Sequence, residues 1–302
     1  MNDFKSGFVT IIGRTNVGKS TLLNGLIGEK IAIMTNKPQT TRNSIRAIIN
    51  KENCQIIFID TPGIHKPKHK LGEQMVSTAF EKAKDVDVIL FVIEATSTEI
   101  GKGDMIIINQ LKQNNIPTIL LINKIDLVKK ETILKTIELY SSQYDFAGII
   151  PISACNRDGF ELVLSEIEKL LPNGPKYYDE EEYTDQTERQ IVEELIREKA
   201  LKLLDEEVPH GVIVEVESMR LRVNKSNVEI YDIEATIYCE KNSHKGIIIG
   251  KNGTMLKRIG QYAREDAEKM LDTKVNLKVW VKVKEDWTDN EKFFQKFYNK
   301  DK

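Results

Sequence analysis

Short runs of apolar and β-branched residues alternate with stretches of helical periodicity through the first half of the chain. The runs predict strands at 8–12, 44–50, 55–59, 86–93, 117–122 and 148–152. Apolar residues at helical spacing predict helices at 21–28, 71–84, 105–112 and 130–142, and a last helix ending near residue 171. Apolar strands that alternate with helices are typical of a mostly parallel sheet covered on both faces. We therefore predict an α/β domain over 1–172.

The pattern changes after the breaker cluster at 171–175, where two prolines flank an Asn-Gly pair. An acidic, polar run follows, and we place a linker at 173–186. Beyond it we predict helices at 187–205, 245–249, 254–271 and 287–298 and strands at 212–223, 228–239 and 274–284. This order indicates a smaller α+β domain over 187–302.

The composition fits a soluble protein with room for two domains, since the 302 residues are 30% charged. No apolar run approaches the roughly 20 residues that cross a bilayer, and the N-terminus lacks a secretory signal pattern. The three cysteines, Cys54, Cys155 and Cys239, have spacings of neither a disulfide framework nor a zinc site. We expect a cytoplasmic protein.

The charge is distributed unevenly along the chain. Residues 241–302 hold 15 Lys and Arg against 9 Asp and Glu, a balance of +6. Because the net charge of the whole chain is −2, residues 1–240 carry −8. A basic end on an acidic protein favours a polyanionic partner for that end. On charge alone, a solvated charged face remains the alternative.

A phosphate-binding pattern, G-x-x-x-x-G-K-S, lies between the first predicted strand and helix. Glycines let successive N–H groups turn toward phosphate oxygens, and the helix N-terminus adds its positive dipole end. Lys19 supplies charge for the β- and γ-phosphates, and the Ser20 hydroxyl is a ligand for Mg²⁺. The predicted nucleotide-binding residues here are Gly13, Arg14, Thr15, Asn16, Val17, Gly18, Lys19, Ser20 and Thr21.

A second phosphate-facing motif, Asp60-Thr61-Pro62-Gly63 followed by Ile64, ends a predicted strand. Asp60 is expected to hold Mg²⁺ through water, and the Gly63 N–H to meet the γ-phosphate. Thr41, or else Thr40, adds a hydroxyl to the metal. We expect 33–44 and 62–72 to order around the γ-phosphate and relax after hydrolysis.

Asn123-Lys124-Ile125-Asp126 selects the base. The Asp126 carboxylate can accept two hydrogen bonds from guanine, whereas adenine offers no such donor pair and would leave it unpaired. We expect the Lys124 stem to cover the base and Asn123 to tie the loops together. Ser153, Ala154 and Cys155 are expected to offer backbone N–H groups to the guanine oxygen.

Gly250-Lys251-Asn252-Gly253 joins two predicted helices, as the G-x-x-G loop of a KH domain does. Glycines there let a nucleic-acid backbone approach the main chain. The element order fits the second type of KH fold, although a plain helix turn remains the alternative for the tetrad alone. The predicted RNA-binding residues are Ile248, Gly250, Lys251, Asn252, Gly253, Lys257 and Arg258, with Ile247 and Ile249 beside Ile248 as an apolar floor for bases.

These motifs resemble those of the translation-factor-related GTPases, and in particular of members with a C-terminal KH domain. The resemblance covers nearly the whole chain and departs at Cys155, where the family often has leucine. It rests on 38–42, 60–65 and 123–126 in the first half and on 207–210, 250–253 and 281–287 in the second. It implies a GTP/GDP switch that binds the 3′ end of small-subunit ribosomal RNA during maturation of the small ribosomal subunit. It also allows peripheral membrane contact, and we expect a monomer.

The expected hydrolysis machinery lacks two familiar groups. Ile64 occupies the place of the glutamine that orients water in many GTPases, which leaves His65 as a substitute. Arg14 and Arg42 are the candidates for an arginine finger. Asn16 lies in the phosphate loop, and the resemblance to GTPases with an asparagine at this place implies that its amide oxygen binds K⁺, which stabilises charge. The alternative role for Asn16 is only to cap a turn. The predicted catalytic set is Asn16, Lys19, Thr41 and Gly63.

Two other functions remain open at this point. A P-loop enzyme that uses ATP, such as a small-molecule kinase, is disfavoured by Asp126. A nucleotide-dependent scaffold at the membrane surface is the other alternative, because a basic face can bind anionic lipid.

Overall fold

The computed structural model describes residues 4–28, 45–60, 86–96, 99–205 and 208–285. The helices predicted at 71–84 and 287–298 lie outside these residues. The described chain divides into two compact units, the first ending at Asp185 and the second beginning at Gln186.

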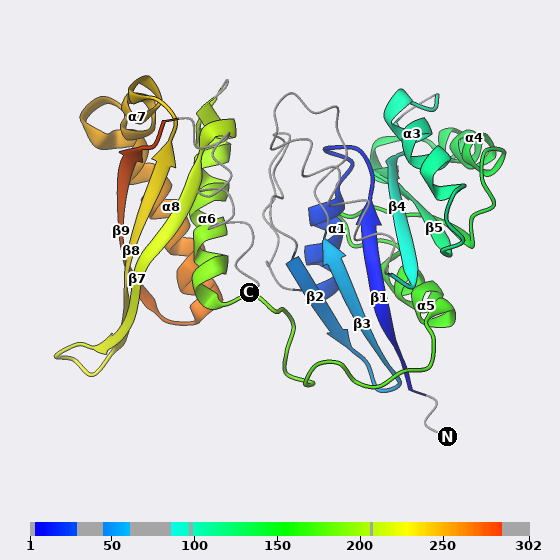
Figure 1. Cartoon of the computed structure of the whole chain (residues 1–302), viewed down its shortest axis with the longest axis horizontal. Helices are drawn as coiled ribbons and strands as arrows, with labels where there is room; N and C mark the ends of the chain where they lie inside the picture. The colour runs from blue at the N-terminus through cyan, green and yellow to red at the C-terminus, as the bar shows by residue number, and fades with distance from the viewer. Residues whose placement is uncertain (1–3, 29–44, 61–85, 97–98, 206–207, 286–302) are drawn as a thin grey trace. The chain divides into compact units, whose positions relative to one another are not determined.

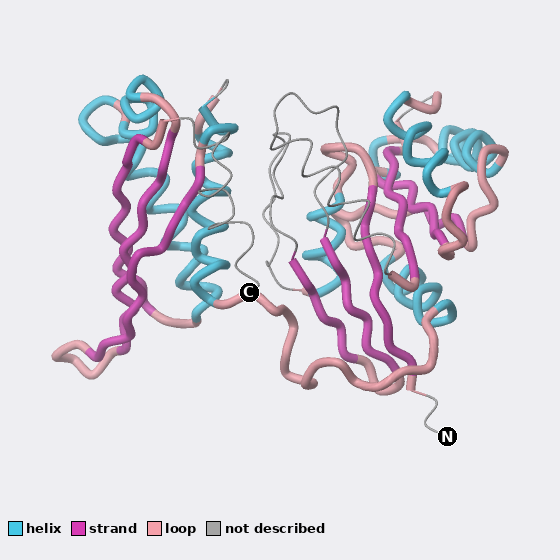
Figure 2. Tube along the Cα trace, viewed as in Figure 1, coloured by secondary structure: helices cyan, strands magenta, loops and turns pink. Residues whose placement is uncertain are grey.

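The first unit is built on a six-stranded sheet (Figure 2). β2 runs antiparallel to β3, and the other neighbours pair in parallel. The carboxyl ends of the parallel strands therefore share one edge, where open α/β sheets bind ligands. In spatial order the strands are β2 (Ile45–Asn50), β3 (Cys54–Asp60), β1 (Lys5–Ile12), β4 (Val88–Glu94), β5 (Thr118–Asn123) and β6 (Gly148–Pro151).

Helices cover both faces of this sheet. α1 (Lys19–Ile27) and α5 (Phe160–Leu170) pack in one apolar core, and α3 (Lys102–Leu111) and α4 (Lys130–Ser141) pack in another. Successive side chains of β4 point to opposite faces of the sheet and so contribute to both cores. Val88, Leu90 and Val92 lie in the first core, and Ile89, Phe91 and Ile93 lie in the second. Each such buried side chain contributes about 1.5–3 kcal/mol. A strand buried on two faces holds the sheet edge rigidly in place.

Residues of the predicted linker are bound to the first unit along β2 and β3. The buried Gln55 carboxamide donates from Nε2 to the Tyr178 carbonyl (2.8 Å) and accepts from the Tyr177 amide (2.7 Å). Thr184 forms an antiparallel bridge with β2. A buried amide needs such partners, so the segment is fixed by polar contacts that leave no apolar pattern in the sequence.

The second unit has the predicted order of helices and strands. β7 pairs antiparallel with β8, and β8 pairs parallel with β9. A capping box between Thr187 and Gln190 starts its first helix. The elements are α6 (Glu188–Leu203), η2 (Val208–Gly211), β7 (Ile213–Val223), β8 (Glu229–Cys239), α7 (Asn242–Ile249), η3 (Lys251–Gly253), α8 (Thr254–Leu271) and β9 (Lys274–Val283).

The core of this unit lies on one face of its sheet. Ile233 and Ile237 of β8 are buried in one cluster with α6 and α8, where the small residues Ala263 and Ala267 let the helix approach closely. Trp280 on β9 is exposed, as are its neighbours Lys278 and Lys282. α6 and α8 lie along the same side of the sheet (Figure 1).

Candidate nucleotide site and nucleic-acid surface

The loop between β1 and α1 requires glycine at two positions. Gly13 has φ 151° and Gly18 has φ 103°. A Cβ on Gly13 would lie 2.4 Å from the Val92 carbonyl oxygen, and one on Gly18 would lie 2.3 Å from Asn123 Nδ2. The loop is therefore pressed against β4 and against the end of β5, as a phosphate-binding backbone must be fixed before its ligand arrives.

Lys19 is the first residue of α1 and is only 8% exposed. Its Nζ donates to the carbonyl oxygens of Arg14 (2.7 Å) and Gly13 (3.1 Å). Gly18 caps the helix without a side-chain hydrogen bond. The ammonium group and the helix N-terminus thus occupy the same loop, which suits an anion.

Asn123, at the end of β5, joins three segments. It is 2% exposed. Its Nδ2 donates to the Val17 carbonyl (2.8 Å), and its Oδ1 accepts from the amides of Lys124 (2.8 Å) and Ala154 (2.9 Å). Asn123 therefore ties the loops together, as expected. One of these bonds occupies the Ala154 N–H, which the sequence analysis expected to be offered to the guanine oxygen.

Lys124 adds a second link to the phosphate loop. Its Nζ donates to the Asn16 carbonyl (2.9 Å) and forms an ion pair with Glu94, the last residue of β4. Sequence reasoning missed Glu94. Its place at the carboxyl end of a buried strand is the signal that would have found it.

Asp126 lies exposed in the short helix η1 (Ile125–Leu127), after the left-handed residue Lys124. Its Oδ1 accepts a hydrogen bond from the Ser153 hydroxyl (2.6 Å). Ser153 therefore orients the carboxylate that is expected to meet guanine, while Cys155 lies exposed beside it.

Several predicted site residues cannot be placed. Thr41, Thr61, Pro62, Gly63 and Ile64 lie outside the described residues, as do the segments 33–44 and 62–72. Asp60 ends β3 at the same sheet edge as the other motifs, with its backbone described.

The Arg14 side chain contacts the start of α3. Its Nε lies 3.1 Å from Asp104 Oδ2 in α3. The candidate finger is therefore engaged by a buried carboxylate, while its carbonyl accepts a hydrogen bond from Lys19 Nζ.

In the second unit, the Gly250–Gly253 tetrad turns the chain sharply between α7 and α8. Gly250 (φ 73°), Asn252 (φ 53°) and Gly253 (φ 75°) all have positive φ. A Cβ on Gly250 would lie 2.7 Å from the Cβ of Met255. Lys251 and Asn252 are exposed at the tip of this turn.

A groove of about 830 Å³ follows the turn and runs between α8 and β9. Leu256, Leu277 and Val279 supply apolar surface. Lys257, Arg264 and Lys274 supply charge, and within the described residues no acidic side chain pairs with any of these three cations. The remaining lining residues are Arg222, Ile230, Gly253, Gly260, Gln261, Glu268, Val275 and Asn276.

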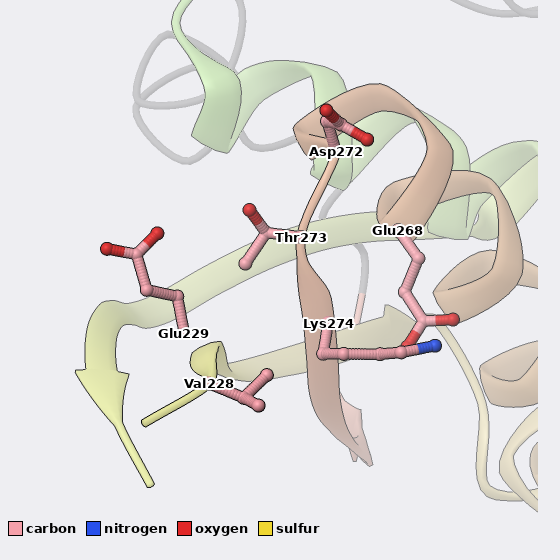
Figure 3. A pocket seen from close by; sticks show the side chains of 6 residues that line it. All are labelled: Val228, Glu229, Glu268, Asp272, Thr273 and Lys274. Carbon is pink, nitrogen blue, oxygen red and sulfur yellow. The ribbon is translucent and has the colours of Figure 1, made fainter. Parts of the chain in front are cut away.

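A smaller cavity of about 410 Å³ shares Glu268 and Lys274 with the groove (Figure 3). Glu229 and Asp272 line it as well, so the lining becomes acidic here. Glu268 Oε1 accepts a hydrogen bond from the Val275 amide (3.1 Å). A phosphate chain would be favoured along α8 and disfavoured at this end.

The structure corrects the prediction for Ile248. Its side chain is 0% exposed and belongs to the core, so it cannot touch RNA, whereas Ile247 is 50% exposed. One helical step of about 100° separates the two, and the sequence does not reveal which of three consecutive isoleucines points inward. Lys257 and Arg258 are exposed, as predicted.

The part of the chain that the structure describes contains no helix with both the length and the apolar character to span a bilayer.

Comparisons with known proteins match a GTPase family to the first half of the chain and a KH domain family to the second half. Residues 8–124 match the family of 50S ribosome-binding GTPases, and residues 207–288 match the KH domain family. The chain is 55% identical to GTPase Era of Clostridium kluyveri over 96% of its length and 98% of that protein. It is 56% identical to GTPase Era of Ruminiclostridium cellulolyticum over 95% of each chain.

Solved structures give the same result. The fold matches a crystal structure of Era in complex with MgGDPNP and nucleotides 1506–1542 of 16S ribosomal RNA, with TM-score 0.91 and 38% identity over 97% of this chain and 98% of that one. It also matches a variant of Aquifex aeolicus Era bound to GDP·AlF4⁻, with TM-score 0.91 and 37% identity over 97% and 99%.

Proposed function

Because this chain belongs to the Era family of GTPases, we propose that it is a ribosome-assembly switch with a guanine-nucleotide site in the first unit and an RNA groove in the second. The resemblance drawn from its motifs is thereby confirmed at the level of the family. The single observation that supports the two-site division best is the clustering of the 13–20, 123–126 and 153–155 loops at one sheet edge, linked by Asn123. We retain 1–172, 173–186 and 187–302 as the proposed domain division.

In the proposed nucleotide site, the amides of the phosphate loop and Lys19 bind the phosphates, and Asp126 selects guanine. The Ser153 hydroxyl holds Asp126 by one oxygen. An adenine base would leave this carboxylate without its pair of donors, which disfavours the ATP-dependent kinase alternative. Displacement of a fluorescent GDP by GTP and by ATP tests the site. We expect ATP to compete at least about 10³-fold more weakly, and equal competition would reject it.

Mg²⁺ fits the donors that the chain offers. Ser20 follows Lys19 in the first turn of α1, and Asp60 ends β3 at the same edge. A hydroxyl and a carboxylate are the hard oxygen donors that Mg²⁺ prefers, and Thr41 is the third proposed ligand. When bound, the ion neutralises charge on the β- and γ-phosphates. Around it, Lys19 holds the phosphates and Gly63 is proposed to donate its N–H to the γ-phosphate.

K⁺ remains a proposal that rests on Asn16. This residue is exposed in the phosphate loop with φ 65°. Asn tolerates the left-handed region better than most residues, so its backbone alone could explain its presence. Hydrolysis rates in K⁺ and Na⁺ at equal ionic strength decide between these explanations. We expect K⁺ to accelerate hydrolysis and Asn16→Ala to remove the difference. Equal rates would leave Asn16 structural and turn attention to His65 or a group supplied by the ribosome.

In the second unit, the distribution of paired and unpaired cationic side chains supports RNA binding in the groove. Lys278 and Lys282, on the open face of the sheet, pair with Glu234 and Glu217. Lys257, Arg264 and Lys274 have no such acidic partners in the described residues and remain available to phosphate. The turn at Gly250 and Gly253 allows a backbone to approach, and the apolar groove wall suits stacked bases.

The proposed RNA is the 3′ end of the small-subunit ribosomal RNA, because Era bound to nucleotides 1506–1542 of 16S ribosomal RNA shares this fold over 97% of the chain. Fluorescence anisotropy with that RNA and with a scrambled sequence of equal length tests the choice. Preference for the natural sequence is expected, and equal affinity would restrict the proposal to non-specific RNA. We propose that the chain works as a cytoplasmic monomer during small-subunit maturation.

A further inference from the structure

Asp104 is a fully buried carboxylate that no step described so far uses. It is the third residue of α3 and is 0% exposed, and its Oδ2 accepts a hydrogen bond from the Tyr140 hydroxyl (2.9 Å). Burial raises the pKa of Asp104, and the Arg14 guanidinium acts in the opposite direction. A carboxylate at such depth is stable in its ionised form only beside a cation.

That cation comes from the phosphate loop. Arg14 Nε lies 3.1 Å from Asp104 Oδ2, while the Arg14 carbonyl accepts from Lys19 Nζ at 2.7 Å. One residue therefore presents its backbone to the phosphate-binding lysine and its side chain to α3. A displacement of the guanidinium would move the peptide that holds Lys19.

The start of α3 is shaped to receive Arg14. A Cβ on Gly103 would lie 3.1 Å from Arg14 Cδ, and one on Gly101 would lie 3.2 Å from Arg14 Nη1. Both distances are shorter than ordinary van der Waals contact. Glycine lowers helix stability by up to about 1 kcal/mol relative to alanine. At Gly103, the missing Cβ leaves room for the stem of Arg14.

The loop is held from its other side by the base-recognition segment. Lys124 Nζ donates to the Asn16 carbonyl, and Asn123 Nδ2 donates to the Val17 carbonyl. We propose that Asp104 is a positioning residue that acts through Arg14 and holds the peptides of residues 14–16 in the conformation that receives the phosphates. This inference rests on the proposed nucleotide site and extends it to α3.

A double-mutant cycle on the full-length chain tests the proposal, with GDP and Mg²⁺ as the probe. Arg14→Ala and Asp104→Asn should each weaken GDP binding by about tenfold, within the range of coupling between contacting residues. The double variant should be no weaker than either single variant. If the two losses multiply, or if Asp104→Asn lowers the melting temperature and leaves GDP affinity unchanged, the proposal is wrong.

Two further variants separate positioning from mere stability. Gly103→Ala crowds the Arg14 stem, so a purely structural site predicts a lower melting temperature with unchanged GDP affinity. Positioning predicts weaker GDP binding without a loss of melting temperature. Tyr140→Phe removes the other donor to Asp104 and should lower the melting temperature while GDP binding persists.

The cycle also separates this inference from the function on which it rests. Wild-type protein that binds GDP, with all variants equal to it, would overturn the role of Asp104 alone. Wild-type protein that fails to bind GDP would overturn the nucleotide site and the positioning role together. Should Asp104→Asn fail to fold, Arg14→Ala and Gly103→Ala still decide the question.

Discussion

The polar groups around the phosphate loop are buried and bonded to one another, whereas the charged groups along the groove of the second unit are exposed and separate. Asn123 and Lys19 each hold two or more backbone groups of the first unit. Lys257 and Arg264 lie two turns apart on the same face of α8, and both side chains are exposed. The first arrangement fixes its donors before the ligand binds, and the second leaves them adjustable.

This difference predicts two scales of response to mutation. A small ligand meets few contacts in a site of low dielectric, so one lost partner costs a large factor. A polyanion meets many weak contacts, so one lost cation costs a small factor and changes the salt dependence.

The largest effect is expected from Asp126→Asn. The amide can donate to the extra carbonyl of xanthine but cannot accept both guanine donors, so the ratio of GTP to XTP affinity should change by about 10⁴-fold. Calorimetric titration of both nucleotides measures the ratio. Asp158→Asn, an exposed neighbour whose backbone bridges to Ser153, is the matched control and should preserve the preference for GTP.

Lys19→Ala should have the next largest effect. Removing the buried ammonium should reduce the hydrolysis rate by about 10²–10³-fold, while the circular dichroism spectrum and RNA affinity remain those of the wild type. The exposed Lys129→Ala serves as the control for loss of one charge. An unchanged hydrolysis rate in Lys19→Ala would contradict the proposal that the phosphate loop binds the nucleotide.

The groove should respond more gradually. Lys251→Asp combined with Asn252→Asp places two carboxylates at the tip of the turn, so RNA affinity should fall by about ten- to a hundredfold, and the slope of log K against log salt should become shallower. Lys282→Asp, on the open face and already paired with Glu217, should change affinity much less. RNA binding that survives in the first unit alone would contradict the two-site division.

The smallest effect concerns thiol reactivity. Burial raises the pKa of the Cys54 and Cys239 thiols, which lowers their thiolate fraction at neutral pH. The exposed Cys155 should therefore react with a maleimide about tenfold faster or more, and GDP should slow this reaction. Labelling that GDP does not affect would argue that the 153–155 loop lies away from the base.

The sequence predicted the helices, strands and motifs of this structure better than the side-chain contacts that join them. The phosphate loop, the Asn123–Asp126 motif and the alternating apolar strands follow from local spacing, because period and glycine placement determine local backbone geometry. The pairs Arg14–Asp104 and Lys124–Glu94 join residues that lie far apart in the chain, and no periodicity encodes them. The wrong assignment of Ile248 has the same origin, since only packing decides which isoleucine of α7 faces the core.

The most direct test of two separate sites is amide hydrogen exchange of the full-length chain, measured free, with GDP and Mg²⁺, and with the 3′-end RNA. GDP should give its strongest protection in 13–20, 123–126 and 153–155, and RNA should give its strongest protection in 250–264 and 274–279. Strongest protection by RNA within the first set, or by GDP within the second, would contradict the account.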